Sequence, residues 1–245
     1  MRTFNNKWCH LFPNILYMCY NSEMSFAFAS IGVATLAYLY LYKKPLTQSG
    51  IQYVLIFYTL METLQGIQYF FVNQCSNAVN IFLTEVAYVL VLTQPLMWNL
   101  FYYFNSSEGD KKIFLVAIVS ILVWMISDVL SRIMYNKTGL NKTNETGFYA
   151  SDKVCTKKEK THLYWQWTSA NFRELNANGL CCFILWFIPA LFSTKFRSTA
   201  LLMMGLSAFA ALVAYLNNEF FTYASLWCYI SVPIMLLIIF DYMFK

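Results

Sequence analysis

Long apolar segments separated by short polar turns run along most of this 245-residue chain. Seven of them come near the ~20 residues that a helix needs to cross a hydrocarbon core of ~30 Å. They are 25–42, 51–72, 79–104, 112–134, 177–193, 198–216 and 220–243. None alternates apolar and polar residues as a barrel strand does, and in lipid a helix satisfies its own backbone. The pattern predicts an all-α bundle of seven transmembrane helices.

Two stretches fall outside these helices, a mixed tail at 1–24 and a polar loop at 135–175. The tail is not a typical signal peptide, because the first long apolar run ends at Lys43 and Lys44 without a small-residue cleavage site. Aromatic residues gather at 162–175 and favour an interfacial anchor or short surface helix, with a lid over the bundle as the alternative. We expect a single domain, 1–245.

Composition agrees with a membrane protein. Hydrophobic residues make up 59% of the chain and charged residues 12%, whereas soluble domains are nearer one half and one quarter. The net charge of +5 is scattered over loops, so we expect no nucleic-acid partner. The lipid bilayer is the expected surrounding, and the chain should be a multipass protein of a plasma, endomembrane or viral membrane.

Orientation follows from Lys and Arg in the short loops, which favour the cytoplasmic side. One side of the predicted bundle carries seven such residues: Lys43, Lys44, Lys111, Lys112, Lys195, Arg197 and Lys245. The other side carries Arg2 and Lys7 in the tail and none in the turns at 73–78 and 217–219. The N-terminus should therefore face outside, with the 1–24 tail and the 135–175 loop, and the C-terminus should be cytoplasmic.

The predicted outer loop carries three Asn-x-Thr glycosylation sequons, at Asn136, Asn141 and Asn144. Four cysteines also fall on the outer side, where oxidation is permitted: Cys9, Cys19, Cys75 and Cys155. They allow three pairings. We favour Cys75 with Cys155, which would tie the long loop to the bundle, and Cys9 with Cys19. Buried or free thiols are the alternative.

Polar side chains interrupt the apolar segments at six candidate pathway positions: Glu62, Gln65, Gln68, Glu85, Gln94 and Asp128. Ionisable groups at membrane depth are costly and usually face the bundle interior. Together these residues predict an acidic cavity that opens outward. Glu62, near mid-membrane and without a basic partner in any helix core, is the central candidate. For Asp128 the alternative is an ion pair with Arg132, and for Glu85 a structural polar contact.

Pro95 predicts a kink in the third helix, because proline removes one backbone hydrogen bond. Thr93 or Gln94 would then bond the freed carbonyl.

Several chemistries are missing from the predicted bundle. Both histidines, His10 and His162, fall outside the helices, which argues against an intramembrane zinc site. No P-loop, G-x-S-x-G or H-E-x-x-H motif is present. We expect no enzymatic activity, no cofactor and no metal.

Three families share features with the chain. The string Leu92-Thr93-Gln94-Pro95-Leu96 resembles the third helix of microbial rhodopsins, but residues 220–244 contain no lysine, so a retinal Schiff base cannot form. Cys75 and Cys155 resemble the usual disulfide of G-protein-coupled receptors, although the acidic-Arg-aromatic motif is missing. Glu62-Thr-Leu-Gln with Gln94-Pro95 is similar to an uncharacterised seven-helix family of large DNA viruses and protists, a resemblance that implies no activity.

Three functions fit these patterns. The first is transport of protons or small cations, with Glu62 as the exchanging group. The second is a receptor-like protein whose outer pocket binds a small ligand. The third is a structural or virion membrane protein, in which Glu62 contributes only to stability.

Overall fold

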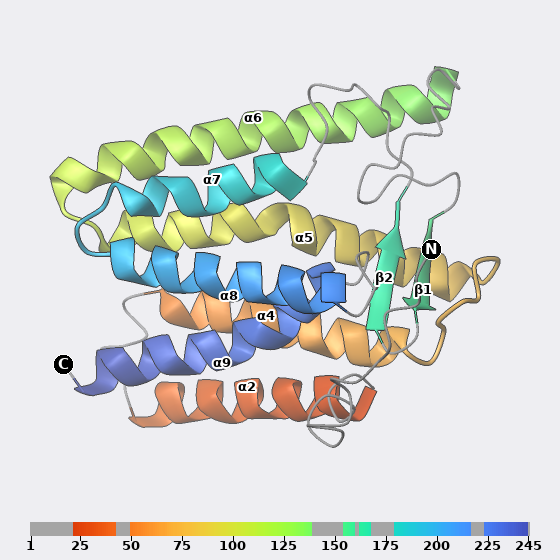
Figure 1. Ribbon diagram of the computed structural model, residues 1–245, viewed down its shortest axis with the longest axis horizontal. Helices are drawn as coiled ribbons and strands as arrows, with labels where there is room; N and C mark the ends of the chain where they lie inside the picture. Colours follow the sequence, from red (N-terminus) through yellow and green to blue (C-terminus); the bar gives the residue numbers. More distant parts are fainter. Residues whose placement is uncertain are drawn as a thin grey trace.

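The structure, a computed structural model, describes residues 22–42, 50–138, 154–159, 162–167, 179–216 and 223–244. The described part is mostly helical. Its seven helices are α2 (Ser22–Tyr42), α4 (Ile51–Gln68), α5 (Ala78–Asn105), α6 (Glu108–Thr138), α7 (Gly179–Leu191), α8 (Arg197–Leu216) and α9 (Tyr223–Phe244). Two strands, β1 (Cys155–Glu159) and β2 (His162–Gln166), form an antiparallel hairpin at one end of the bundle (Figure 1).

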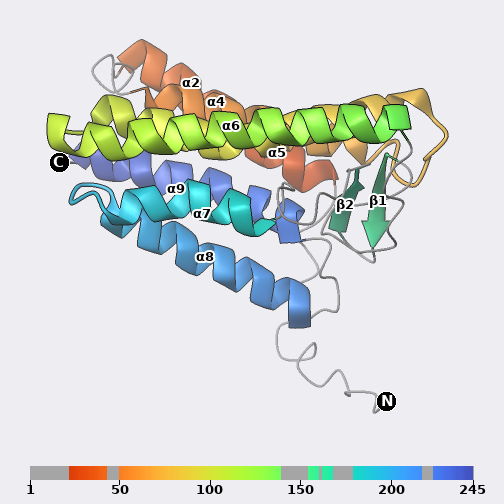
Figure 2. The ribbon, with the colours of Figure 1, turned by 90° about the horizontal axis from the view of Figure 1, so that it is seen from above.

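The helices form one closed ring in chain order. Each helix packs against the next one along the chain, and α9 packs back against α2 and α4. α5 also contacts α7, and α4 contacts α2, α5 and α9, so both helices lie in the bundle interior (Figures 1 and 2). The hairpin packs against α5 and α9 across the helix ends. This arrangement places the polar residues of α4 between α2, α5 and α9.

The helix positions agree with the apolar segments, and the differences lie at their ends. α4 ends at Gln68 rather than at residue 72, because the chain turns through 69–73 and Asn73 has a positive φ of 66°. α6 runs on to Thr138, so the loop begins later than position 135. The hairpin corrects the expectation of a short surface helix in the aromatic segment 162–175, since 162–166 is a strand.

Three of the helices are long and apolar enough to cross a membrane by composition: α2, α5 and residues 108–130 of α6. α4 has 18 residues but owes its lower hydropathy to buried polar side chains, and α7 has only 13 residues. The membrane-protein class is therefore supported by three candidate spans, and the full set of seven stays a prediction.

Two apolar clusters hold the ring together. The larger one takes residues from all seven described helices and is centred on Tyr58, Trp98 and Phe187. Trp98 Nε1 donates a hydrogen bond to the Tyr58 hydroxyl at 2.7 Å, which satisfies both buried polar atoms. The smaller cluster joins α4, α5 and α6 to the hairpin around Met61 and Trp165. The hairpin is thus part of a core and not a loose appendage.

α5 continues through Pro95 as a helix. The Thr93 hydroxyl donates to the carbonyls of Val89 and Leu90, both at 3.0 Å. The carbonyl that loses its partner to proline is four residues back, at Val91. Thr93 therefore bonds the turn before the freed carbonyl, which corrects the Thr93 half of the expectation and leaves the Gln94 alternative a prediction.

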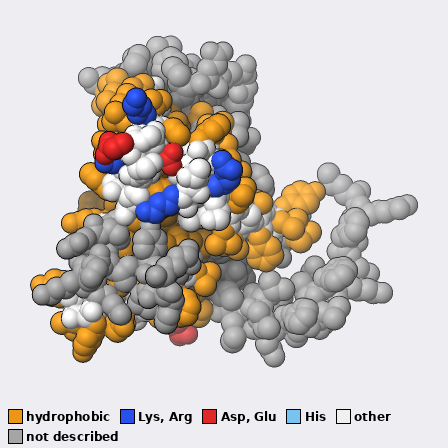
Figure 3. All heavy atoms as spheres, turned by 90° about the vertical axis from the view of Figure 1, so that its left-hand side faces the viewer, with side chains coloured by type: hydrophobic (Ala, Val, Ile, Leu, Met, Phe, Trp, Pro, Cys, Tyr) orange, Lys and Arg blue, Asp and Glu red, His pale blue; other side chains and the backbone are white. Residues whose placement is uncertain are grey.

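The end opposite the hairpin is basic. The turns between α5 and α6 and between α7 and α8 lie there, and Lys and Arg side chains gather on this face with Asp and Glu side chains among them (Figures 1 and 3). Lys195 Nζ donates to the Asn105 carbonyl at 2.8 Å, and Arg197 Nε donates to the Leu191 carbonyl at 2.9 Å. These cations bond carbonyls at the ends of α5 and α7, where helices leave carbonyls without internal partners.

Candidate functional site

The candidate site is the polar face of α4. The side chains of Glu62 and Gln65 are fully buried, each with 0% of the residue exposed. Both carboxyl oxygens of Glu62 and both amide atoms of Gln65 lack a hydrogen-bond partner among the described residues. Buried polar groups in folded proteins are nearly all bonded. Two adjacent groups without partners, one turn apart on one helix, therefore require an explanation other than stability.

α2 closes one side of this face. The Ser25 hydroxyl lies beside the Glu62 carboxyl, but it does not reach hydrogen-bond geometry with either carboxyl oxygen. Two glycines bring the helices this close. A Cβ on Gly66 would lie 2.9 Å from the Phe26 ring, and a Cβ on Gly32 would overlap the Thr59 hydroxyl. Gly66 and Gly32 therefore let α2 approach α4 closely.

Gln68, one turn beyond Gln65, lies in a very different environment. Its Nε2 donates to the Leu83 carbonyl and to Thr156 Oγ1, both at 3.0 Å. Its Oε1 accepts a 3.0 Å bond from Trp165 Nε1. Gln68 therefore holds the hairpin against the end of α4, with every amide atom bonded, and does not resemble the unbonded Gln65.

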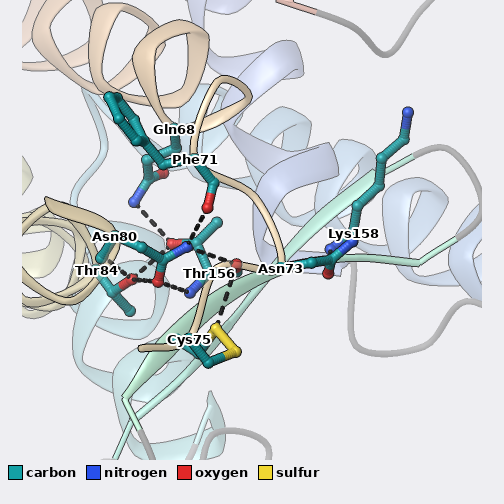
Figure 4. Close-up of a disulfide and its surroundings, with 9 residues drawn as sticks. Gln68, Phe71, Asn73, Cys75, Asn80, Thr84, Thr156 and Lys158 are labelled. Atoms are coloured by element: carbon teal, nitrogen blue, oxygen red, sulfur yellow. Dashed lines mark hydrogen bonds between the residues drawn. A yellow bond between two sulfur atoms is a disulfide. The ribbon is translucent and has the colours of Figure 1, made fainter. Parts of the chain in front are cut away.

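Thr156 of β1 is the centre of this attachment (Figure 4). Its hydroxyl lies 2.7 Å from Thr84 Oγ1. Since Thr84 donates to the Asn80 carbonyl and Gln68 donates to Thr156, the Thr156 proton goes to Thr84. Asn80 clamps the strand backbone, accepting from Thr156 N and donating to its carbonyl, both at 3.0 Å. The network is closed and fully buried.

A disulfide joins Cys75, in the turn before α5, to Cys155 at the start of β1 (Figure 4). This is the pairing that the sequence favoured. Asn73 adds two bonds beside it, donating its backbone N–H to the Thr156 carbonyl and accepting from Lys158 N, both at 3.1 Å. The hairpin is thus attached covalently and by hydrogen bonds at the same strand end.

The hairpin buries one aromatic face. Trp165 and Trp167 stack with their ring centroids 5.8 Å apart. Trp167 Nε1 donates to the Thr84 carbonyl at 2.8 Å. His162 is also buried, and desolvation lowers its pKa from 6.5 to about 4, with the positive charge of Lys158 acting in the same direction. His162 is therefore neutral at pH 7.

The remaining predicted pathway residues are spread through the bundle. Glu85 is half-buried near the hairpin end of α5, and Gln94 is buried further along the same helix. Asp128 is buried on α6, which packs against α5 and α7 on the far side of the ring from α2 (Figure 1). The structure brings Glu62 and Gln65 together and leaves Asp128 on another helix interface.

Several predicted positions lie outside the described part of the chain. They are Cys9, Cys19, Asn141, Asn144, the side chain of Asn136 and the side chain of Arg132. Among described residues, no group of three or more His, Cys, Asp or Glu side chains is arranged to hold a metal ion.

Sequence reasoning missed Asn80, Thr84 and Thr156. The first two recur four residues apart on α5, which is the spacing of one helical face, so a polar stripe was visible. Nothing in the sequence paired that stripe with Thr156, which is 76 residues away from Asn80.

Comparison with known proteins places the chain among uncharacterised relatives. The profile of a family described as a family of unknown function, DUF5765, matches residues 23–245. Uncharacterized protein R287 of Acanthamoeba polyphaga mimivirus is 27% identical over 237 residues, which cover 91% of this chain and 94% of the relative. No solved structure matches. The viral relative fits the resemblance to an uncharacterised family of large DNA viruses.

Proposed function

The chain belongs to the family of unknown function DUF5765, and because that membership carries no activity, we propose from the buried site that it conducts protons or small cations across a membrane. Glu62 is the exchanging group in this proposal, and Gln65 is its polar neighbour. We propose no enzymatic activity and no cofactor.

One observation carries the proposal, the contrast between neighbouring turns of α4. Gln68 bonds through both its amide nitrogen and its amide oxygen, whereas Glu62 and Gln65 bond through none of their side-chain polar atoms among the described residues. An ionised carboxylate without partners is costly in hydrocarbon, and such groups mark ion paths and proton relays. A purely structural Glu62 would be expected to have partners like those of Gln68.

We propose that the seven apolar segments predicted from the sequence cross the bilayer, in a rhodopsin-like architecture. The closed ring of consecutive helices supports this arrangement. Exposed aromatic side chains near the basic end of the bundle support it too, because aromatic residues favour the membrane interface. They include Tyr40, Tyr42, Tyr53, Phe104 and Phe192, and Phe70, Phe82 and Tyr215 are exposed near the other end.

The same proposal places the hairpin end outside and the C-terminus in the cytoplasm. The turns between α5 and α6 and between α7 and α8 lie at the end opposite the hairpin (Figure 1), and the sequence has Lys111, Lys112, Lys195 and Arg197 at or beside them, as expected for a cytoplasmic face. The Cys75–Cys155 disulfide lies at the hairpin end, which supports an oxidising compartment on that side.

Proton flux into proteoliposomes tests the function. Purified protein is reconstituted with a pH-sensitive dye inside the vesicles, and a membrane potential is imposed. We expect Glu62→Gln to lower the flux at least tenfold, because the amide cannot exchange a proton. Glu108→Gln makes the same chemical change on an exposed side chain that pairs with Lys111 at the basic end, and it should leave the flux unchanged. Folded protein in tight vesicles without flux would exclude proton conduction, and the same assay with Na⁺ or K⁺ gradients would then test cations.

A second candidate is the receptor-like function. Trp186 of α7 and Trp227 of α9 are buried with ring centroids 5.3 Å apart, and neither indole N–H has a hydrogen-bond partner among the described residues. Two such donors in an aromatic cluster favour an apolar ligand that carries a hydrogen-bond acceptor. A ligand-dependent rise in melting temperature that is lost in Trp227→Phe, without any flux, would support this function over conduction.

A further inference from the structure

We propose that the β1–β2 hairpin is a lid, latched by hydrogen bonds to Gln68, Asn80 and Thr84 and hinged at the Cys75–Cys155 disulfide, which controls access of solvent to Glu62 and Gln65. The role of the lid in conduction rests on the proposed function. Whether the hairpin opens is tested without measuring flux.

The first step is position. Gln65 and Gln68 are three residues apart on α4, a rise of about 4.5 Å. Gln68 is the last residue of the helix, and the hairpin is bonded to it through Thr156 and Trp165. The hairpin therefore covers the end of the helix that carries the unbonded polar groups, one turn away from Gln65.

The second step is the nature of the contact. The bonds to α4 and α5 run through hydroxyl, amide and indole groups, all of which water can replace when the hairpin lifts. The covalent bond at Cys155 does not exchange with water. Lifting also exposes the buried Trp165 and Trp167 rings, so the seated hairpin is the resting state, and the disulfide keeps the hairpin attached when it lifts.

The third step is the location of these attachments along the hairpin. Thr156 is paired with Trp165 and Cys155 with Gln166 in the strand register. The disulfide, the Thr156 bonds and the Trp165 bond to Gln68 therefore lie within two register positions. The hinge and the latch therefore lie close together. A small movement of this strand end breaks the latch hydrogen bonds, while the disulfide keeps the hairpin attached.

Labelling of an introduced cysteine tests the lid. Gln65→Cys is combined with the latch variant Thr84→Val/Thr156→Val, which removes both hydroxyls and keeps the side-chain shape. Purified protein in proteoliposomes is treated with a membrane-impermeant maleimide. Subtracting the rate of the same protein with Gln65 intact removes the contribution of native cysteines. We expect Cys at position 65 to react at least tenfold faster in the latch variant than with the latch intact.

The matched control is Thr63→Val, which removes a partly buried threonine hydroxyl from α4. That hydroxyl bonds only within its own helix, to the Thr59 carbonyl at 2.8 Å, so the labelling rate should stay unchanged. Equal rates with and without the latch, in protein that keeps its melting temperature, would overturn the lid.

Hydrogen exchange of the native chain gives a second test that does not depend on the latch variant folding. We expect amides of the two strands, 155–159 and 162–166, to exchange at least tenfold faster than those of α5, because the lid opens while the ring stays closed. Hairpin amides as slow as α5 would show a fixed plug and overturn the proposal. Faster labelling without Glu62-dependent flux would keep the lid and exclude conduction, so the two failures are distinguishable.

Discussion

Gly32 and Gly66 decide how closely α2 and α4 approach. Added methyl groups would meet the Thr59 side chain and the Phe26 ring, respectively. The Thr59 hydroxyl cannot easily move aside, because it donates a buried 2.7 Å hydrogen bond to the Leu55 carbonyl. Small residues at such contacts let helices pack closely in membranes, where packing rather than the hydrophobic effect drives association. The close approach also keeps Ser25 beside Glu62.

Gly32→Ala should therefore destabilise the protein. Overpacking of a tight contact costs about 1–3 kcal/mol, which should appear as a lower melting temperature in detergent. Gly205→Ala in α8 is the matched control, since nothing lies within 4 Å of its added Cβ and alanine favours helix by up to ~1 kcal/mol. Thr59→Ala removes the clashing atom and should restore part of the loss in the double variant. An unchanged melting temperature for Gly32→Ala would show that the helices separate at no cost.

The three polar residues of α4 show the limit of prediction at this scale. Sequence spacing placed Glu62 and Gln65 on one face of a helix, and both are buried there. The same reasoning treated Gln68 as a third pathway residue, yet the structure uses it to bond the hairpin. The difference depends on Thr156 and Trp165, which are distant in sequence, so no local pattern could reveal it.

At the scale of elements, the β1–β2 hairpin is the main feature that the apolar segments did not predict. Leu163, Trp165 and Trp167 are buried, while Tyr164 and Gln166 between them are partly exposed. This period of two is typical of a strand, so the signal was present in the loop sequence. The neighbouring Lys-rich strand β1 carries no such pattern and is held by Asn73, Asn80 and the disulfide.

Acid should loosen the hairpin through His162. Its pKa is lowered to about 4 by burial and by Lys158, from 6.5. Between these two values the detached hairpin binds a proton that the seated hairpin does not, so seating weakens as the pH falls from 6.5 towards 4. The loss is at most about 3 kcal/mol, at 1.36 kcal/mol per pKa unit.

Hydrogen exchange of 155–166 at pH 7 and pH 4.5, corrected for the intrinsic pH dependence of amide exchange, measures this effect. Protection of the hairpin should fall at the lower pH, and His162→Gln should remove most of the difference because it cannot titrate in this range. Protection that is equal at both pH values in the native chain would contradict a buried neutral histidine.

At the scale of the whole molecule, the two ends of the bundle differ in chemistry. One end has the α5–α6 and α7–α8 turns (Figure 1), beside which the sequence places Lys111, Lys112, Lys195 and Arg197, and the other carries the hairpin with its disulfide. Both features favour the same orientation, the first through the positive-inside rule and the second through redox compartment. They are independent, because the disulfide does not depend on charge.

An epitope tag after Lys245 tests that orientation. We expect the tag to be reached by antibody only after the plasma membrane or vesicle is permeabilised, because the C-terminus should be cytoplasmic. A tag in the turn at 73–78 would disturb the Cys75–Cys155 disulfide. The outer side is better tested by whether this disulfide forms, which appears as a difference in mobility between reducing and non-reducing gels. A C-terminal tag that is accessible in intact cells would reverse the proposed topology.

The sequence alone determined where the helices lie, because an apolar run of membrane length is a local property that needs no partner. It also determined that Glu62 and Gln65 share a face, since helical spacing is local too. Only the tertiary structure decided which polar residues remain unbonded. Gln68 is bonded by a hairpin from residues 155–166, whereas Glu62 faces α2 beside Ser25 without a bond. A hydrogen bond needs two groups within about 3 Å, and whether distant segments meet at that distance depends on the packing of the whole ring.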